Sequence, residues 1–206
     1  VDDVSKGMRV VGWNIFALSN ASTFALTANL RMAGSEVDID ATSTLYAGNG
    51  VHPVISADAD PVVVNNAGTI DLTNGAGSPG NTLTIDGNYA ASQGRLKLVT
   101  TLNAGGALLN QSTDRLLVQG DASGTTSLHL TPSATSTGAL TDLDRNGYVG
   151  PAEGISMVQV GGASTGDAFQ VAGGYVAFGP WQYGLYAFAP GASDAGQRVV
   201  PGSGNG

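Results

Sequence analysis

The sequence predicts an all-β fold of short strands, either stacked as coils or packed as a sandwich. Residues 81–130 contain four runs in which apolar and polar residues alternate with a period of two, separated by glycine-rich turns at 86–88, 103–106 and 120–124. The apolar members of the runs are Leu83 and Ile85, Leu96 and Leu98, Leu116 and Val118, and Leu128 and Leu130. Such alternation is typical of a strand with one buried face. Evenly spaced short strands that face one core are typical of coils and sandwiches.

The composition agrees with many strands and turns. The 206 residues include 31 Gly, 42% hydrophobic residues and 12% charged residues, and only two Lys and two Glu are present. The net charge of −8 argues against nucleic acid or an anionic membrane as a partner, since both attract basic patches. The absence of cysteine excludes a disulfide scaffold and cysteine-ligated zinc.

The N-terminal part has the same period of two. Apolar and polar residues alternate through Phe24, Leu26, Ala28, Leu30 and Met32, and segments of this kind recur at intervals of about twenty residues, the length of a solenoid coil. We expect residues 52–60 to form a loop. Three asparagines, Asn65, Asn66 and Asn74, are interpreted as turn residues, with stacked asparagine ladders as the alternative.

An ordered series of motifs carries a family resemblance. The series consists of NTLTIDGNY (81–89), GRLKLV (94–99), STDRLLVQG (112–120), GISMVQVGG (154–162) and AFQVAGGYVAFGPWQYGLYAFAP (168–190). From about Asn81 to Pro190 it resembles the C-terminal, autochaperone region of a pertactin-like autotransporter passenger. The resemblance implies a right-handed parallel β-helix that precedes an outer-membrane β-barrel and helps the passenger to fold during secretion.

The resemblance also suggests how the chain is divided. We expect residues 1–80 to be β-helix coils of the passenger stem, residues 81–190 to be the autochaperone-like region, and residues 191–206 to be a flexible tail towards the barrel. Six aromatic residues within 174–190 are expected to fill and close the last coils as a capping hairpin. Because the chain begins with Val and shows no signal peptide, we expect it to be a piece of a longer secreted protein.

The function implied is structural. We expect a non-catalytic stem that nucleates passenger folding and supports display on the bacterial surface, with the passenger's own β-barrel as its partner. An adhesive module that contacts a host or neighbouring cell is the alternative, and a polysaccharide-acting β-helix enzyme is less favoured. No catalytic residues are predicted: His52 and His129 lack a nucleophile or acid nearby in sequence, and Asp38 and Asp40 are interpreted as a solvated strand face.

One motif predicts a metal site. Residues 142–153, DLDRNGYVGPAE, match the twelve-residue calcium loop of the EF-hand. The expected ligands are the side chains of Asp142, Asp144, Asn146 and Glu153 and the carbonyl of Tyr148, while Gly147 supplies the sharp turn. No helical pattern flanks the loop, so a polar turn is the competing interpretation. We therefore predict a Ca²⁺ site without the two helices of an EF-hand.

The densest apolar alternation and the aromatic cluster both lie within residues 81–190. We therefore expect this stretch to hold most of the stability and to fold before the N-terminal coils. Replacing Leu116 or Trp181 by Ala is expected to cost a few kcal/mol each if the side chain is buried.

Overall fold

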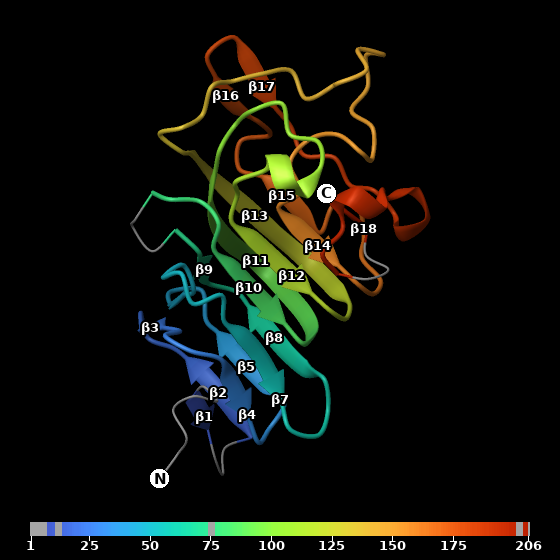
Figure 1. Ribbon diagram of the computed structural model, residues 1–206. Coiled ribbons are helices and arrows are strands. Elements are labelled where there is room, and N and C mark those ends of the chain that lie inside the picture. The colour runs from blue at the N-terminus through green and yellow to red at the C-terminus, as the bar shows by residue number, and fades with distance from the viewer. Residues whose placement is uncertain (1–7, 11–13, 74–76, 201–203, 206) are drawn as a thin grey trace.

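The protein is a parallel β-helix, in which strands from successive coils lie on top of one another (Figure 1). The computed structural model describes residues 8–10, 14–73, 77–200 and 204–205. Within these residues the only helices are short 3₁₀ turns, namely η2 (Leu108–Asn110), η3 (Pro190–Ala192) and η4 (Ala195–Gln197). None of the helices described is long enough to cross a membrane.

The first sheet takes one strand from each coil. In spatial order it contains β1 (Met8–Val10), β4 (Leu30–Met32), β7 (Val54–Ala57), β10 (Thr82–Ile85), β12 (Arg115–Val118), β14 (Val158–Val160) and β18 (Gly204–Asn205). All neighbouring pairs are parallel except β14 and β18, which are antiparallel. The sheet therefore grows by one strand per coil until the last strand returns along its edge.

The second sheet is bent and forms the other two sides of the coils. One half contains β2 (Ile15–Leu18), β5 (Glu36–Ile39) and β8 (Val62–Asn66), and the other contains β3 (Thr23–Ala25), β6 (Thr44–Tyr46) and β9 (Thr69–Asp71). The long strand β11 (Gly87–Thr100) pairs with both halves, and β13 (Ala122–Pro132) and β15 (Phe169–Val171) follow it. The register between β11 and β13 shifts between Ala91 and Gly94, so β11 turns the corner without ending.

The core consists of aliphatic side chains that stack from coil to coil. Leu30 lies opposite Ile55, Ile55 opposite Ile85, and Ile85 opposite Val118, and all four side chains are fully buried. The alternating apolar residues predicted within residues 81–130 point inward, although Leu130 is only partly buried. A strand with period two buries one face, and parallel stacking places identical faces in one column.

Coil length increases along the chain, which the sequence interval did not predict. A coil takes 21 residues from Phe16 to Val37 but 42 residues from Val118 to Val160. The expected interval of about twenty residues is therefore right for the first coils and too short for the last. The extra residues lie in loops between the strands, chiefly the segment 133–157 that contains the acidic motif.

Two local predictions were wrong. Residues 52–60 are not only a loop, because β7 occupies 54–57 and pairs with β4 and β10, with Ile55 fully buried. Asn65 and Asn66 lie within β8 and not at a turn, and Asn74 lies outside the described residues. The turns expected at 86–88 and 120–124 are also shorter than predicted, since β11 starts at Gly87 and β13 at Ala122.

A buried polar network replaces apolar contacts at one level of the core. The Nδ2 of Asn66 donates to the hydroxyl of Tyr89 at 2.9 Å, and that hydroxyl lies 2.9 Å from the hydroxyl of Thr126. The Tyr89 ring stacks on Phe169 with 5.9 Å between the ring centroids. Three successive coils are thus joined by side-chain hydrogen bonds inside the solenoid.

The C-terminal end carries the predicted hairpin. Strands β16 (Val176–Phe178) and β17 (Trp181–Tyr183) pair antiparallel and lie at the end of the solenoid opposite the N-terminus (Figure 1). The first and second sheets continue across residue 80 without a break, since β10 pairs with β7 and β11 with β8 and β9. The division at residue 80 therefore does not coincide with a boundary between sheets, and a difference in stability across it stays a prediction.

Candidate functional site: the acidic loop and the C-terminal end

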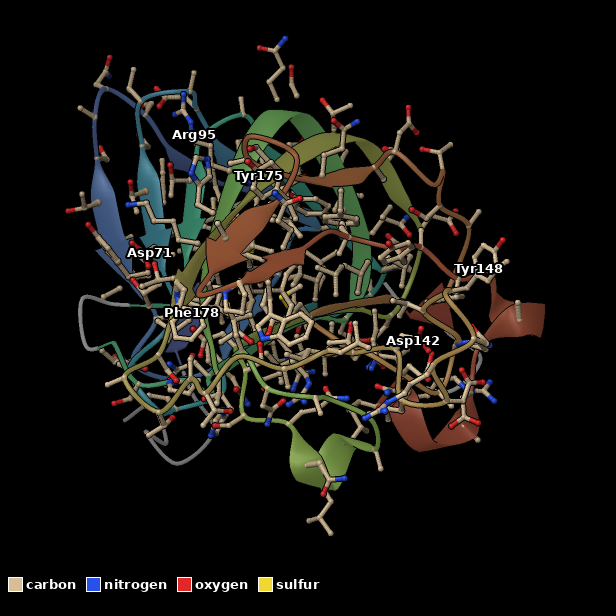
Figure 2. The ribbon with its side chains drawn as sticks, turned by 90° about the horizontal axis from the view of Figure 1, so that it is seen from above. Asp71, Arg95, Asp142, Tyr148, Tyr175 and Phe178 are labelled. Carbon is tan, nitrogen blue, oxygen red and sulfur yellow. The ribbon has the colours of Figure 1, made fainter. Side chains whose placement is uncertain are left out.

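The acidic loop brings three of its predicted ligands together. One carboxylate oxygen each from Asp142, Asp144 and Glu153 lies within 4.8 Å of the other two. Asp142 is buried, Glu153 is partly buried and Asp144 is exposed. Figure 2 places Asp142 and Tyr148 on one side of the molecule, far from Asp71 and Arg95. The three acidic residues that the calcium-loop spacing singles out are therefore also close together in space.

Backbone N–H groups hold the carboxylates in place. Glu153 Oε1 accepts from the N–H groups of Leu143 at 2.5 Å and Asp144 at 3.0 Å, and Oε2 accepts from Gly150 at 2.6 Å. Glu153, the last residue of the motif, thus closes the loop onto its own beginning. Oxygen donors of this kind suit a hard cation such as Ca²⁺.

The first carboxylate of the motif is oriented by the turn at Gly147. Asp142 accepts from the N–H groups of Asn146 at 3.1 Å and Gly147 at 2.8 Å. Gly147 has a φ of +91°, a conformation that few side chains tolerate. Desolvation raises the pKa of Asp142, but the hydrogen bonds from Gly147 and Asn146 outweigh it and lower that pKa below its ordinary value. The loop therefore favours a charged carboxylate at its first position.

The remaining two predicted ligands lie on the exposed side of the loop. Asn146 donates from Nδ2 to Asp144 at 2.9 Å and accepts at Oδ1 from the N–H of Tyr148 at 2.9 Å. The Tyr148 side chain is 80% exposed. Asn146 is thus oriented by the motif itself, and its amide oxygen is engaged with Tyr148. As expected, no helix flanks the loop: it follows an irregular segment and is followed by β14.

The hairpin is fastened to the last coil through one tyrosine and one glycine. The Tyr183 hydroxyl accepts from the N–H of Ala139 at 2.8 Å and donates to its carbonyl at 2.9 Å. Gly138 lies under the rings of Trp181 and Phe178, and a Cβ on it would meet them at 3.0 and 3.2 Å. Trp181 and Phe178 therefore pack on Gly138, but both are only partly buried. Tyr175 and Tyr186 are exposed, so the expected filling and closing of the last coils by the six aromatic residues stays a prediction.

A glutamine cluster that the sequence did not predict fastens the segment 195–200. Gln159 accepts at Oε1 from the N–H groups of Val199 at 2.6 Å and Val200 at 2.9 Å, and donates to the Gln197 carbonyl at 2.7 Å. Gln111 donates to Oε1 of Gln197 at 2.7 Å. Val200, Gln159 and Gln197 are each 1% exposed. The flexibility expected for residues 191–206 stays a prediction, and these contacts are the ones that would oppose it.

A second unpredicted group joins coils at residues 80–114. Asp114, fully buried, accepts at Oδ1 from the N–H groups of Gly80 at 3.0 Å and Asn81 at 2.8 Å, and at Oδ2 from the N–H of Val99 at 2.7 Å. Asn81 in turn accepts from the N–H of Gly50 at 2.9 Å. Burial raises the pKa of Asp114, and the N–H groups of Val99 and Asn81 oppose that rise. A buried charge is tolerated when it is hydrogen-bonded in this way.

The other polar residues considered in the sequence form no constellation typical of catalysis. His52 and His129 are both exposed. Asp38 accepts from Nδ2 of Asn65 at 2.8 Å. Hydrogen bonds from the hydroxyls of Ser43 and Thr42 and from the N–H of Asn20 hold the pKa of Asp40 well below its ordinary range. These two carboxylates therefore serve as acceptors within and between coils.

Comparison with known proteins adds family information. The model of the family Autochaperone Domain Type 1 matches residues 61–185. The Adhesin BmaC autotransporter of Brucella suis biovar 1 (strain 1330) is 31% identical over 192 residues, which cover 82% of this chain. Two proteins of Escherichia coli (strain K12), named as uncharacterized proteins YuaQ and YdeU, are each 34% identical, over 122 and 111 residues that cover 59% and 53% of this chain. The chain spans only 5%, 8% and 20% of these three relatives.

Proposed function

Because the chain belongs to the Autochaperone Domain Type 1 family of autotransporter passengers, we propose that it is a non-catalytic stem whose C-terminal coils nucleate the folding of the coils before them. In the whole protein, the partner of this stem would be an outer-membrane β-barrel, and the place of action would be the bacterial surface. The stem would hold the more distal part of the passenger away from the membrane. The resemblance to an autotransporter named as an adhesin supports export to that surface.

The pairing of β11 is the observation that carries the folding role. This strand, at 14 residues the longest described, pairs on one edge with β13 from Tyr89 to Thr100 and on the other with β8 and β9. A strand edge with unpaired N–H and C=O groups is a template for the next strand. Once β11 is held by β13, its other edge can order the preceding coil. Folding would then proceed from the C-terminal coils towards the N-terminus.

A pair of matched variants tests this order. Leu116 and Leu45 are both fully buried, one in the C-terminal coils and the other in the N-terminal coils. We expect Leu116→Ala to slow refolding, with a φ-value of about 0.5 or more, and Leu45→Ala chiefly to speed unfolding, with a φ-value near zero. Stopped-flow refolding and unfolding in urea measure both. A higher φ-value at Leu45 than at Leu116 would contradict nucleation by the C-terminal coils.

Adhesion is the second candidate function. It is supported by the name of the Brucella relative and by large apolar side chains that project into solvent, of which Leu109 is 96% and Tyr148 80% exposed. Tyr is enriched among the residues that contribute most to binding at protein interfaces. Beads coated with the chain should attach to host or neighbouring bacterial cells, and a Leu109→Ser, Tyr148→Ser double variant should attach less. Equal attachment by the two chains would remove the support that these side chains give.

The acidic loop is proposed to bind one Ca²⁺. The convergent oxygens of Asp142, Asp144 and Glu153, together with the amide of Asn146 and the carbonyl of Tyr148, supply the donor set that Ca²⁺ prefers. Three carboxylates this close repel one another, and a divalent cation removes that repulsion. Without flanking helices we expect an affinity in the range ~10⁻⁴–10⁻³ M, typical of extracellular modules. Binding would fix residues 142–153 against the start of β14.

Calorimetric titration tests the calcium site. The wild-type chain should give a heat of binding, and its melting temperature should be higher with Ca²⁺ than with chelator. At a free Ca²⁺ concentration of a hundred times Kd, the free energy of unfolding should rise by about 2.7 kcal/mol. An Asp144→Ala, Glu153→Ala double variant should give neither. Asp167→Ala, which removes an exposed acid outside the loop, is the control and should behave as wild type. Equal melting temperatures of the wild type in Ca²⁺ and chelator would leave only a polar turn.

A further inference from the structure

The solenoid ends in a cavity of about 350 Å³. Its floor is formed by side chains of the last coils, including Leu102, Leu130 and Met157. Residues 182–186, from the end of β17 and the segment directly after it, also line the cavity. Its volume falls within the range of about 300–1,000 Å³ that is usual for small-molecule sites.

A buried hydroxyl in the lining has no partner. Thr100 is fully buried, and its Oγ1 has no hydrogen bond within the described part of the chain. Along β11, Leu96, Leu98 and Thr100 follow the same inward alternation, so Thr100 continues the row of core side chains into the cavity wall. Because Thr100 is 0% exposed, its hydroxyl lies behind the cavity wall, out of reach of a ligand in the cavity.

The charged side chains that line the cavity are both acidic. Asp142 and Glu153 both line the cavity, and their hydrogen bonds come from backbone N–H groups of the acidic loop. No Lys, Arg or His is found among the described residues that line the cavity. In a partly enclosed space, carboxylates that no cation neutralises attract a positive charge more strongly than they would in water.

Two tyrosines complete the site at its rim. Tyr148 is 80% exposed and Tyr186 is 54% exposed, and both line the cavity. The face of an aromatic ring attracts a cation, and the edge of the ring packs against apolar groups. The cavity thus combines an aliphatic floor, an aromatic rim and two carboxylates.

We propose that this cavity binds a small organic cation with an apolar body, such as an aromatic or branched alkyl ammonium compound. The apolar body would lie on the floor formed by Leu102, Leu130 and Met157. The ammonium group would face Asp142 and Glu153, with the rings of Tyr148 and Tyr186 beside it. This site goes beyond a folding or supporting role, and it does not require that role.

Two probes of equal size test the charge preference. 2-Phenylethylammonium and 2-phenylethanol differ only in the group at the end of the same aromatic body. Titrated into the full 206-residue chain, the ammonium probe should shift the amide NMR signals of residues lining the cavity and should bind about tenfold tighter than the alcohol. Asp142 and Glu153 are also proposed ligands of Ca²⁺, which would compete with the ammonium group. Both titrations are therefore run with chelator. Equal affinity of the two probes, or no shift at the cavity amides, would overturn the proposal.

Matched tyrosine variants locate the site. Tyr186→Ala removes a ring from the rim, whereas Tyr175→Ala removes a ring that is similarly exposed, at 49%, but does not line the cavity. We expect the first variant to weaken the ammonium probe at least about threefold and the second to leave its affinity unchanged. Equal effects of the two tyrosine variants would show that the probe binds elsewhere.

Discussion

The coils from β2 to β13 and the C-terminal end beyond Ala139 are stabilised by different interactions. In the coils, the same kind of aliphatic side chain recurs at each level, as in the column from Leu30 to Ile85. At the C-terminal end the aromatic side chains within 174–190 are partly buried or exposed, and individual hydrogen bonds accepted by Tyr183, Gln159 and Gln197 fasten the chain. Each coil of a solenoid can pack on its neighbours through the same kind of apolar contact. The last coil has no further coil to pack against, so it needs contacts of another kind.

The largest expected effect is the loss of a stacked aliphatic side chain. Leu116 is fully buried opposite Leu83 and Val158, so Leu116→Ala should lower the free energy of unfolding by about 2–5 kcal/mol. Trp181→Ala should cost less, about 1–2 kcal/mol, because Trp181 is only partly buried. Urea denaturation measures both, with Leu109→Ala, at a 96% exposed position, as the control. A greater loss at Trp181 than at Leu116 would mean that the end holds the fold more strongly than the coils.

The next effect concerns a polar contact inside the coils. Asp114→Asn should lower the free energy of unfolding by about 1–3 kcal/mol. The carboxylate accepts the N–H groups of Gly80, Asn81 and Val99 through two oxygens, whereas an amide has only one oxygen that can accept. This variant tests whether single polar side chains contribute to stability only at the end of the solenoid or also within the coils. Urea denaturation at fixed pH gives the difference.

The same variant has a defined pH dependence. Burial raises the folded-state pKa of Asp114 above the unfolded value, so the folded state takes up the proton more readily. The stability contributed by this group is then fully present below the unfolded pKa, about 3.9, and is lost as pH rises through the folded pKa. The difference between wild type and Asp114→Asn should therefore be larger near pH 4 than near pH 8. A difference that grows with pH would show that the hydrogen bonds outweigh burial.

A third variant tests the fastening of the C-terminal segment. Gln159→Leu keeps much of the buried volume but leaves the N–H groups of Val199 and Val200 without their acceptor. We expect a loss of about 1–2 kcal/mol, together with faster amide hydrogen exchange confined to residues 195–200. Unchanged exchange in this segment would show that the burial of Val200 is sufficient to hold it.

How far the sequence predicted the structure depended on the kind of interaction. Alternation of apolar residues was sufficient for β10 to β13, because a period of two assigns each side chain to a face without knowledge of its partner. It failed at β7, where Pro53 and the acids after Ala57 suggested a loop although Ile55 is a core residue. The acidic loop was found because its ligands are contiguous, and the structure does bring three of them together.

Contacts between polar residues distant in sequence could not be predicted in the same way. Gln111 and Gln197 are 86 positions apart, and each residue alone resembles an ordinary surface glutamine. Asp114 lies beside Arg115 in sequence, so a surface ion pair would have been the natural expectation, yet its carboxylate accepts backbone N–H groups from residues up to 34 positions away. Such side chains acquire their role only from the stacking of coils.

The smallest expected effect lies on the outer surface of the coils. Lys97 Nζ lies 3.4 Å from Asp71 Oδ2, between neighbouring strands β11 and β9. The Lys97 side chain is 48% exposed, so solvent screens the pair, and Lys97→Met should change the free energy of unfolding by only about 0–1 kcal/mol. Arg95→Met, two residues earlier on the same exposed face, is the matched control, because Arg95 makes no ion pair within the described residues.

Salt separates the contribution of charge at this pair from that of the Lys97 stem. The effect of Lys97→Met should shrink towards that of Arg95→Met in 1 M salt, where the screening length falls to about 3 Å. Asp71 also accepts from the N–H and hydroxyl of Thr73, at 2.8 and 2.6 Å, so its carboxylate stays hydrogen-bonded when Lys97 is replaced. A loss above about 2 kcal/mol that persists in high salt would therefore place a strong interaction on the coil surface. The coils would then depend on specific polar contacts to the same degree as the C-terminal end.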